Sequence, residues 1–109
     1  MEIDSRIEKF IRRHHVLTIA AATPDGEPYC CNLFYAYDGA GGFVFTSDMH
    51  PRHADMMVRN GRVAASIVLE TRIVGKVQGL QITGRVVRTD DDAAKRIYLK
   101  RFPYAVVAP

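Results

Sequence analysis

The feature that most constrains this chain is a series of short apolar segments separated by turn residues, which favours antiparallel strands. The segment VLTIAAA, residues 16–22, is followed by TPDGEP, where Pro24 suits the second position of a turn and Gly26 suits a positive φ. The next strand is expected at residues 29–37, and DGAGG separates it from a third strand at residues 43–46. These segments predict three antiparallel strands joined by tight turns.

Helices are expected at three places along the chain. The first can be capped by Asp4 or Ser5, a second is expected over residues 51–59, and a third can be capped by Thr89 or Asp90. The acidic residues that open the third helix favour it, because they lie near the positive end of the helix dipole. The apolar residues that recur at helical spacing in the first helix are Ile3, Ile7, Phe10 and Ile11.

Two further strands are expected in the second half of the chain, at residues 62–70 and 77–88. Gly79 and Gly84 lie within the last strand and suggest a bulge or a close approach of another backbone. Strands therefore dominate and most connections are short. The fold class predicted is mainly β (α+β), a small antiparallel barrel with flanking helices.

Composition narrows the function without identifying it. The chain has 109 residues, which predicts one small domain. Its formal net charge is +3, and the sequence has no dense block of Lys and Arg, so nucleic-acid binding is not expected. Its longest apolar run, residues 16–22, is much shorter than the roughly 20 residues of a membrane-spanning helix. The charged start, MEIDSRIEKF, does not have the pattern of a signal peptide, so we expect a cytoplasmic protein.

The two cysteines, Cys30 and Cys31, are adjacent within a predicted strand. Neighbouring residues of a strand point to opposite faces, so a disulfide between them is not expected. They do not form a CxxC motif, which argues against a metal or redox site. Reduced, partly buried thiols are the prediction.

The stretch FVFTSDMHPRHADMMVRNG places hydroxyl and basic residues where a strand ends and a helix begins. Pro51 suits the first helical position, and the free amides of the first turn favour an anion. Thr46 and Ser47 offer hydroxyl donors, while Arg52 and His53 add positive charge, so the group can hold a phosphate. The alternative is that the hydroxyl residues are ordinary helix caps and that Arg52 is solvated.

Histidine positions suggest a metal site only weakly. His50 and His53 are three residues apart on one helix edge, but a zinc site generally needs three or four protein ligands and no third is evident. His14 and His15 follow the first helix and are expected at the surface. No metal is therefore predicted.

The order of these segments resembles the pyridoxamine 5'-phosphate oxidase-like, FMN-binding split barrel, in particular its small YhbP-like branch. The segments that carry the resemblance are TPDGEPYCCNLFYAYD, FVFTSDMHPRHADMMVRNGRVAASIV and VQGLQITGRV. It extends from Ile7 to Phe102. Their order and spacing make the resemblance specific for the fold and less specific for an activity.

The resemblance also implies where FMN would bind. In that family hydroxyl and basic residues after the third strand hold the phosphate, and here His53 occupies a position that is often lysine. The flavin edge lies along the second strand, near Asn32 and backbone groups, and a glutamine from the fifth strand reaches it. That glutamine is Gln81, with Gln78 on the opposite face as the reserve. The implied cofactor-binding residues are Cys31, Asn32, Leu33, Thr46, Ser47, Arg52, His53 and Gln81.

The resemblance further implies a homodimer with the flavin between subunits and a flavin-dependent oxidoreductase of unknown substrate. The chain is shorter than the full oxidases, whose C-terminal segment contributes flavin and substrate contacts, so oxidation of pyridoxamine phosphate is not expected. Two alternatives remain open. One is a haem or deazaflavin cofactor, with His50 or His53 as a haem ligand, and the other is a cofactor-free stress or regulatory interaction module.

Overall fold

The computed structural model describes residues 3–46, 59 and 61–103. The helix expected over residues 51–59 lies outside this part of the chain, except for Arg59. The described elements, in chain order, are α1 Ser5–Arg13, β1 Val16–Ala22, β2 Pro28–Phe34, β3 Ala36–Tyr37, β4 Phe43–Val44, β5 Arg62–Leu69, the short 3-10 helix η1 Val74–Lys76, β6 Gln78–Arg85 and α3 Asp92–Arg101.

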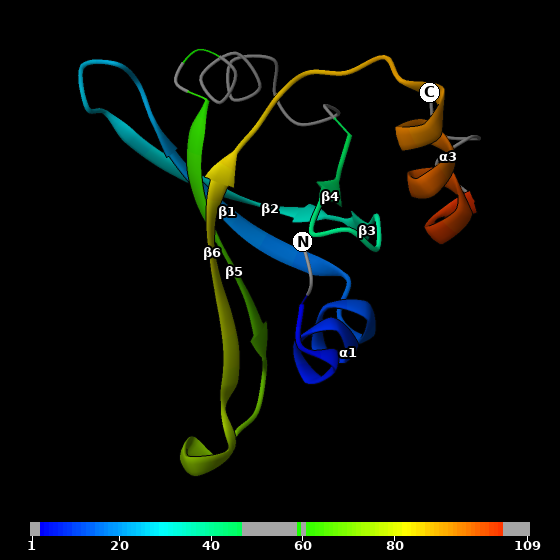
Figure 1. Cartoon of the computed structure of the whole chain (residues 1–109). Helices are drawn as coiled ribbons and strands as arrows, with labels where there is room; N and C mark the ends of the chain where they lie inside the picture. The colour runs from blue at the N-terminus through cyan, green and yellow to red at the C-terminus, as the bar shows by residue number, and fades with distance from the viewer. Residues whose placement is uncertain (1–2, 47–58, 60, 104–109) are drawn as a thin grey trace.

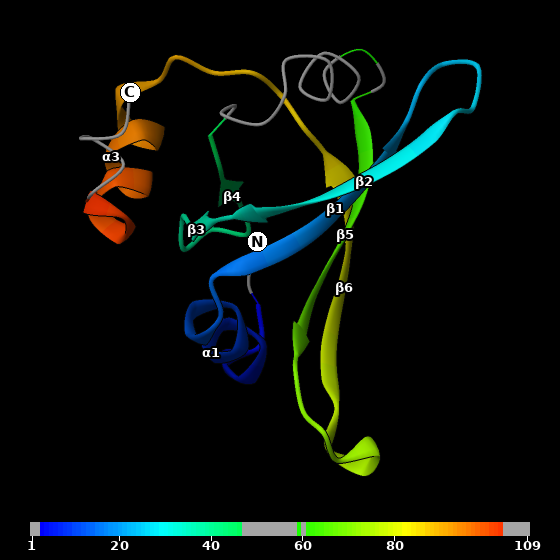
Figure 2. The same cartoon turned by 180° about the vertical axis from the view of Figure 1, so that it is seen from behind.

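A four-stranded antiparallel sheet of order β2-β1-β5-β6 forms the larger part of the fold, and β3 and β4 form a second, two-stranded sheet. The large sheet is strongly twisted, and the β5–β6 hairpin extends from it as a long arm (Figures 1 and 2). Helix α1 lies beside β3, while α3 packs against the β3–β4 hairpin on the side away from that arm. The predicted antiparallel, mainly β architecture with flanking helices is confirmed.

The turn between β1 and β2 forms where the sequence predicts it. Gly26 has a φ of +91°, a conformation that residues with a Cβ rarely adopt. The Thr23 amide donates to the Glu27 carbonyl at 2.9 Å, and the Gly26 amide donates to the Thr23 carbonyl at 2.9 Å. This turn fixes the register of β1 against β2, in which Thr18 lies opposite Asn32.

The strand expected at residues 29–37 is interrupted at Tyr35, which separates β2 from β3. The Tyr35 amide donates to the His15 carbonyl at 3.0 Å, and its fully buried side chain donates from the hydroxyl to the Ile11 carbonyl at 2.6 Å. Ile11 is in the last turn of α1, where carbonyls have no partner within the helix. Tyr35 therefore ends one strand because it joins the chain to the end of α1.

The predicted bulge in the last strand is wrong. The pairing of β5 with β6 runs without interruption from Arg62 opposite Arg85 to Leu69 opposite Gln78. A Cβ at Gly84 would meet no atom within 4 Å, and one at Gly79 would be in ordinary contact at 3.6 Å. These glycines lie in a regular hairpin, so neither a bulge nor a close backbone approach explains them.

One predicted helix cap is confirmed and the other is wrong. The Asp4 side chain accepts a hydrogen bond from the Arg6 amide at 2.8 Å at the start of α1. Helix α3 begins later than expected, because its cap is Asp91 rather than Thr89 or Asp90. The Thr89 hydroxyl instead accepts from the Asp91 amide at 3.1 Å, which adds a turn before the helix.

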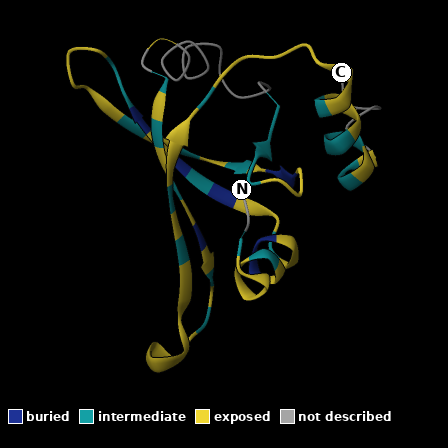
Figure 3. Cartoon of the chain, viewed as in Figure 1, coloured by how far each residue is buried: buried dark blue, intermediate teal, exposed yellow. Residues whose placement is uncertain are grey.

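The core lies between the large sheet, α1 and the β3–β4 hairpin (Figure 3). Burial alternates along the strands, so that every second side chain of β1 and β5 faces this core. The radius of gyration is 14.5 Å, compared with about 13 Å for a compact domain of this length. The buried core residues are Phe10, Ile11, Leu17, Ile19, Ala21, Tyr35, Ala36, Tyr37 and Ile67.

None of the helices in the described ranges has the length and apolar character needed to cross a membrane.

Candidate functional site

A row of polar side chains crosses the face of the large sheet that points away from the core, which we call the outer face. Asn32 of β2 lies opposite Thr18 of β1, and Thr18 lies opposite Ser66 of β5. Ser66 in turn lies opposite Gln81 of β6. One transverse row thus joins all four strands, and three strand spacings put its two ends about 14 Å apart.

A hydrogen bond orients the first member of this row. The Thr18 hydroxyl donates to the Asn32 side-chain oxygen at 2.6 Å, an arrangement that directs the amide nitrogen of Asn32 away from Thr18. Asn32, Ser66 and Gln81 are exposed, so their remaining donors and acceptors are accessible from the outer face. The row therefore offers alternating hydrogen-bonding groups to a ligand placed across the sheet.

Small side chains occupy the next row of the outer face. Ala20 of β1 lies between Cys30 of β2 and Ala64 of β5, and Ala64 lies opposite Thr83 of β6. Because two of these side chains are single methyl groups, a flat ring can approach the sheet closely here. The polar row then lies along one edge of such a ring.

Apolar side chains border the polar row on its other side. Val16 and Phe34 lie opposite each other, and Val68 follows Ser66 by two residues on the same face of β5. The exposed fractions are 43% for Val16 and 57% for both Phe34 and Val68. The outer face therefore combines exposed apolar area with a polar row, as is usual for ligand and subunit contacts.

The structure separates the predicted residues of the second strand. Asn32 lies on the outer face, whereas the side chains of Cys31 and Leu33 pack against the core cluster. Burial raises the pKa of the Cys31 thiol, and the neighbouring Cys30 raises it further, so this thiol stays protonated near neutral pH. Any contact of Cys31 or Leu33 with a ligand on the outer face would have to use the backbone.

The prediction of free thiols is confirmed, whereas the prediction that both are partly buried holds for Cys31 and is wrong for Cys30. Both thiols are free, with Cys30 exposed on the outer face and Cys31 partly buried on the inner face. The described residues contain no group of three or more His, Cys, Asp or Glu side chains arranged to hold a metal ion. No structural observation on this part of the chain therefore assigns a redox or metal role to the thiols.

The two glutamines of β6 lie on opposite faces, as their spacing predicts. Gln81 belongs to the polar row of the outer face. Gln78 lies two residues before the core-facing Leu80 and therefore on the same face of β6. It lines a surface cleft beside Ile7 and Phe10 of α1. Of the two candidates, only Gln81 shares a face with Asn32.

The predicted phosphate site is only partly covered by the structure. Thr46 is half-buried, two residues beyond the end of β4. Ser47, Arg52 and His53 lie outside the described residues, as does His50. Their part in phosphate, metal or haem binding stays a prediction.

Both histidines at the end of α1 were expected at the surface, but His14 is partly buried. His15 is exposed, but the His14 ring packs on Phe10 with centroids 4.4 Å apart. The buried Nε2 atom of His14 has no hydrogen-bond partner within the described part of the chain. Burial, followed by the charges of Arg13 and His15, lowers the pKa of His14 below its usual value of 6.5.

Thr18 and Ser66 belong to the site but were not predicted from the sequence. Each is the only hydroxyl residue of its strand, in VLTIAAA and RVAASIVL, and its neighbours on both sides are apolar, which was the available signal. That signal shows that each faces away from the core. Their alignment with Asn32 and Gln81 depends on the pairing of β1 with β5, which the local sequence does not specify.

A family model described as pyridoxamine 5'-phosphate oxidase matches residues 3–105. The chain belongs to this family. Among curated members of the group, a UPF0306 protein of Photorhabdus laumondii is 35% identical over 104 residues, covering 92% of this chain and 72% of that protein. A UPF0306 protein of Yersinia enterocolitica is 34% identical over 105 residues, covering 93% and 71%.

Solved structures confirm the split-barrel fold of this pyridoxamine 5'-phosphate oxidase family member. The haem storage protein HutZ of Vibrio cholerae has a TM-score of 0.76 and 16% identity, covering 98% of this chain and 80% of that chain. A haem-binding protein of Mycobacterium smegmatis has a TM-score of 0.75 and 22% identity, covering 98% and 47%. A putative 5-nitroimidazole resistance protein of Bacteroides thetaiotaomicron has a TM-score of 0.76 and 18% identity, covering 94% and 68%.

Proposed function

We propose that this protein binds FMN on the outer face of its sheet and acts as a flavin-dependent oxidoreductase, with the cofactor held between two copies of the chain. The observation that carries the proposal is the polar row of Asn32, Thr18, Ser66 and Gln81 beside a row of small side chains. An isoalloxazine ring is flat and has one edge rich in hydrogen-bonding atoms. The outer face offers a row of small side chains for the ring and a polar row for its edge.

The residues divide into two groups in this proposal. The amide groups of Asn32 and Gln81 hydrogen-bond the polar edge of the ring, while Ala20 and Ala64 leave room for the ring above the strands. The phosphate end is assigned to Thr46, Ser47, Arg52 and His53, the assignment that the sequence suggests. These four residues supply positive charge and hydroxyl donors for the phosphate.

The chain's own contribution is to position the flavin and shield it from water. Bound FMN supplies hydride or electron transfer, which no amino-acid side chain provides. The Thr18–Asn32 hydrogen bond fixes the orientation of the amide before the ligand arrives, so little side-chain order is lost on binding. Cys31 keeps its proton near neutral pH and takes no part as a thiolate.

A second copy of the chain covers the flavin in this proposal. The outer face of a single chain leaves a ligand open to solvent on one side, whereas a cofactor site generally buries most of its ligand. The exposed Val16, Phe34 and Val68 supply apolar area for such a contact. The radius of gyration exceeds that of a compact domain, which is consistent with a protomer that completes its packing in a dimer.

Haem is the second candidate, because two proteins of the same fold, from Vibrio cholerae and Mycobacterium smegmatis, are described as haem storage and haem-binding proteins. An axial ligand would then come from His50 or His53, which lie outside the described residues. The two cofactors are distinguished by absorption, since haem gives one sharp Soret band, whereas FMN gives two broader bands, one in the near-ultraviolet and one in the blue.

The proposal is tested by comparing two substitutions of the same residue type on opposite faces of β6. Gln81→Leu removes the amide from the outer face and should weaken FMN binding by about 0.5–1.5 kcal/mol, the usual worth of a neutral hydrogen bond. Gln78→Leu makes the same chemical change on the other face and should leave the affinity unchanged. Fluorescence titration with FMN measures both. Equal affinity of Gln81→Leu and the unmodified protein would remove Gln81 from the site.

A further inference from the structure

A basic cleft lies where the end of α1, the strand β3 and the last turn of α3 meet, away from the outer face of the large sheet. Its volume is about 400 Å³, within the range of small-molecule sites. Three cations and one carboxylate line it, which leaves an excess of positive charge. The lining residues are Arg12, Ala36, Tyr37, Asp38, Ile97, Lys100 and Arg101.

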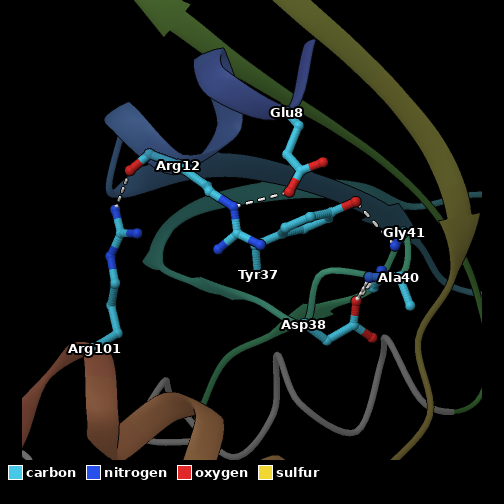
Figure 4. A network of polar contacts seen from close by, with 8 residues as sticks. Glu8, Arg12, Tyr37, Asp38, Ala40, Gly41 and Arg101 are labelled. Atoms are coloured by element: carbon cyan, nitrogen blue, oxygen red, sulfur yellow. Dashed lines mark hydrogen bonds and ion pairs between the residues drawn. The ribbon is translucent and has the colours of Figure 1, made fainter. Parts of the chain in front are cut away.

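Arg12 is held in place by two contacts. Its Nε donates to Glu8 at 3.0 Å, and its guanidinium lies over the Tyr37 ring, 5.2 Å from the centroid (Figure 4). Tyr37 is buried and its hydroxyl accepts from the Gly41 amide at 3.0 Å, so the ring itself is fixed. Among the described residues, the terminal nitrogens of Arg12 make no hydrogen bond.

Arg101 reaches the same place from the other helix. One terminal nitrogen donates to the Arg12 carbonyl at 2.9 Å (Figure 4). The same nitrogen donates to the His14 carbonyl at 2.7 Å, also at the end of α1. These bonds join α3 to α1 and fix the guanidinium, while its other N–H groups have no acceptor among the described residues. A positioned guanidinium with free N–H groups is suited to the oxygens of a phosphate.

Lys100 and Asp38 complete the charge of the cleft. Lys100 is exposed and has neither an ion pair nor a hydrogen bond within the part of the chain that the structure describes. The Asp38 carboxylate already accepts from the amides of Ala40 and Gly42, at 2.7 and 2.8 Å, within the β3–β4 turn. Both bonds are accepted by Oδ1, so the turn orients the carboxylate, which keeps its negative charge. The three cations still outnumber this one carboxylate among the residues that line the cleft.

We propose that this cleft binds the phosphate group of a small organic molecule, at a site separate from the outer face. Arg12, Lys100 and Arg101 hold the phosphate oxygens, and the side chains of Ala36 and Ile97 form an apolar wall for the organic part. A bare phosphate ion would leave much of the 400 Å³ unfilled, which is why an organic phosphate fits better. The proposal does not depend on the flavin assignment.

The test is calorimetric titration with phenyl phosphate at constant ionic strength, with inorganic phosphate and benzoate as comparison ligands. Phenyl phosphate should saturate the protein and bind more tightly than either comparison ligand. Lys100→Gln should weaken it roughly tenfold, as expected for the loss of a charged hydrogen bond. Lys95→Gln is the matched control, since Lys95 is exposed on the same helix but does not line the cleft.

Saturation with FMN separates this site from the proposed flavin site. Phenyl phosphate should bind with the same affinity to FMN-loaded and to FMN-free protein. It should also bind if the protein proves unable to bind FMN. Loss of phenyl phosphate binding on loading would mean that one phosphate site serves both ligands, which would overturn the proposal. Equal affinities of Lys100→Gln and Lys95→Gln, or the absence of saturable binding, would also overturn it.

Discussion

The Tyr35 hydroxyl is expected to make one of the largest single contributions to stability in this fold. Tyr35 is fully buried, and its hydroxyl donates to the Ile11 carbonyl at 2.6 Å. Burial raises the pKa of Tyr35 to about 12, so the hydroxyl keeps its proton at any pH at which the protein would be studied. Tyr35→Phe retains the ring and removes only this donor.

The cost of this substitution follows from the position of Ile11 in the last turn of α1. Its carbonyl has no partner within the helix, so removal of the hydroxyl leaves a buried acceptor without a hydrogen bond. Such a loss costs about 1–3 kcal/mol, and we expect about 2 kcal/mol. For a domain of 109 residues, this corresponds to a fall in melting temperature of roughly 8 °C.

Urea unfolding and calorimetry measure this effect, with Tyr98→Phe as the control. Tyr98 of α3 packs its ring on Phe102 with centroids 5.1 Å apart, and no hydrogen bond of its hydroxyl is seen among the described residues. Removal of the Tyr98 hydroxyl should change the free energy of unfolding by less than about 0.5 kcal/mol. If the two variants were equally stable, the assigned role of the Tyr35 hydroxyl would be refuted.

Three further predictions concern pH, assembly and the phosphate. Because the pKa of His14 is lowered in the folded state, its stabilising contribution is complete above pH 6.5 and falls as the pH decreases toward the lower folded value. His14→Phe should flatten this part of a urea-unfolding pH profile, and a profile that the substitution leaves unchanged would contradict the assignment. Val68→Asp should convert a dimer to a monomer in analytical ultracentrifugation, and Val74→Asp on the 92% exposed hairpin tip should not. Arg52→Ala should weaken FMN binding by about 1.5–3 kcal/mol and leave the affinity for riboflavin unchanged in titrations. Equal losses of affinity for both ligands would contradict a phosphate contact.

Local sequence signals predicted much of the fold because they depend on neighbouring residues. The Gly26 turn, the Asp4 cap and the opposite faces of Gln78 and Gln81 all follow from spacing within a few residues. The start of α3 was misplaced because several acidic residues in sequence can each cap a helix. The glycines of β6 were misread because their flexibility does not require a bulge.

The missed features depend on contacts between distant parts of the chain. Thr18 and Ser66 become neighbours only through the pairing of β1 with β5, which no local pattern specifies. The interruption at Tyr35 reflects its bond to Ile11, 24 residues earlier in the chain. The cleft beside α3 depends on Arg101 reaching the carbonyl of Arg12, 89 residues away, so the sequence alone gave no sign of it.

The measurement that tests the central claim most directly is the visible absorption spectrum of the purified protein, recorded before and after addition of FMN and removal of the excess. Flavin bands that remain with the protein, one FMN for each chain, are the result that the account predicts. A Soret band in the purified protein would assign haem instead. A spectrum without cofactor bands after the addition of FMN would contradict the claim that the polar row on the outer face is a flavin site.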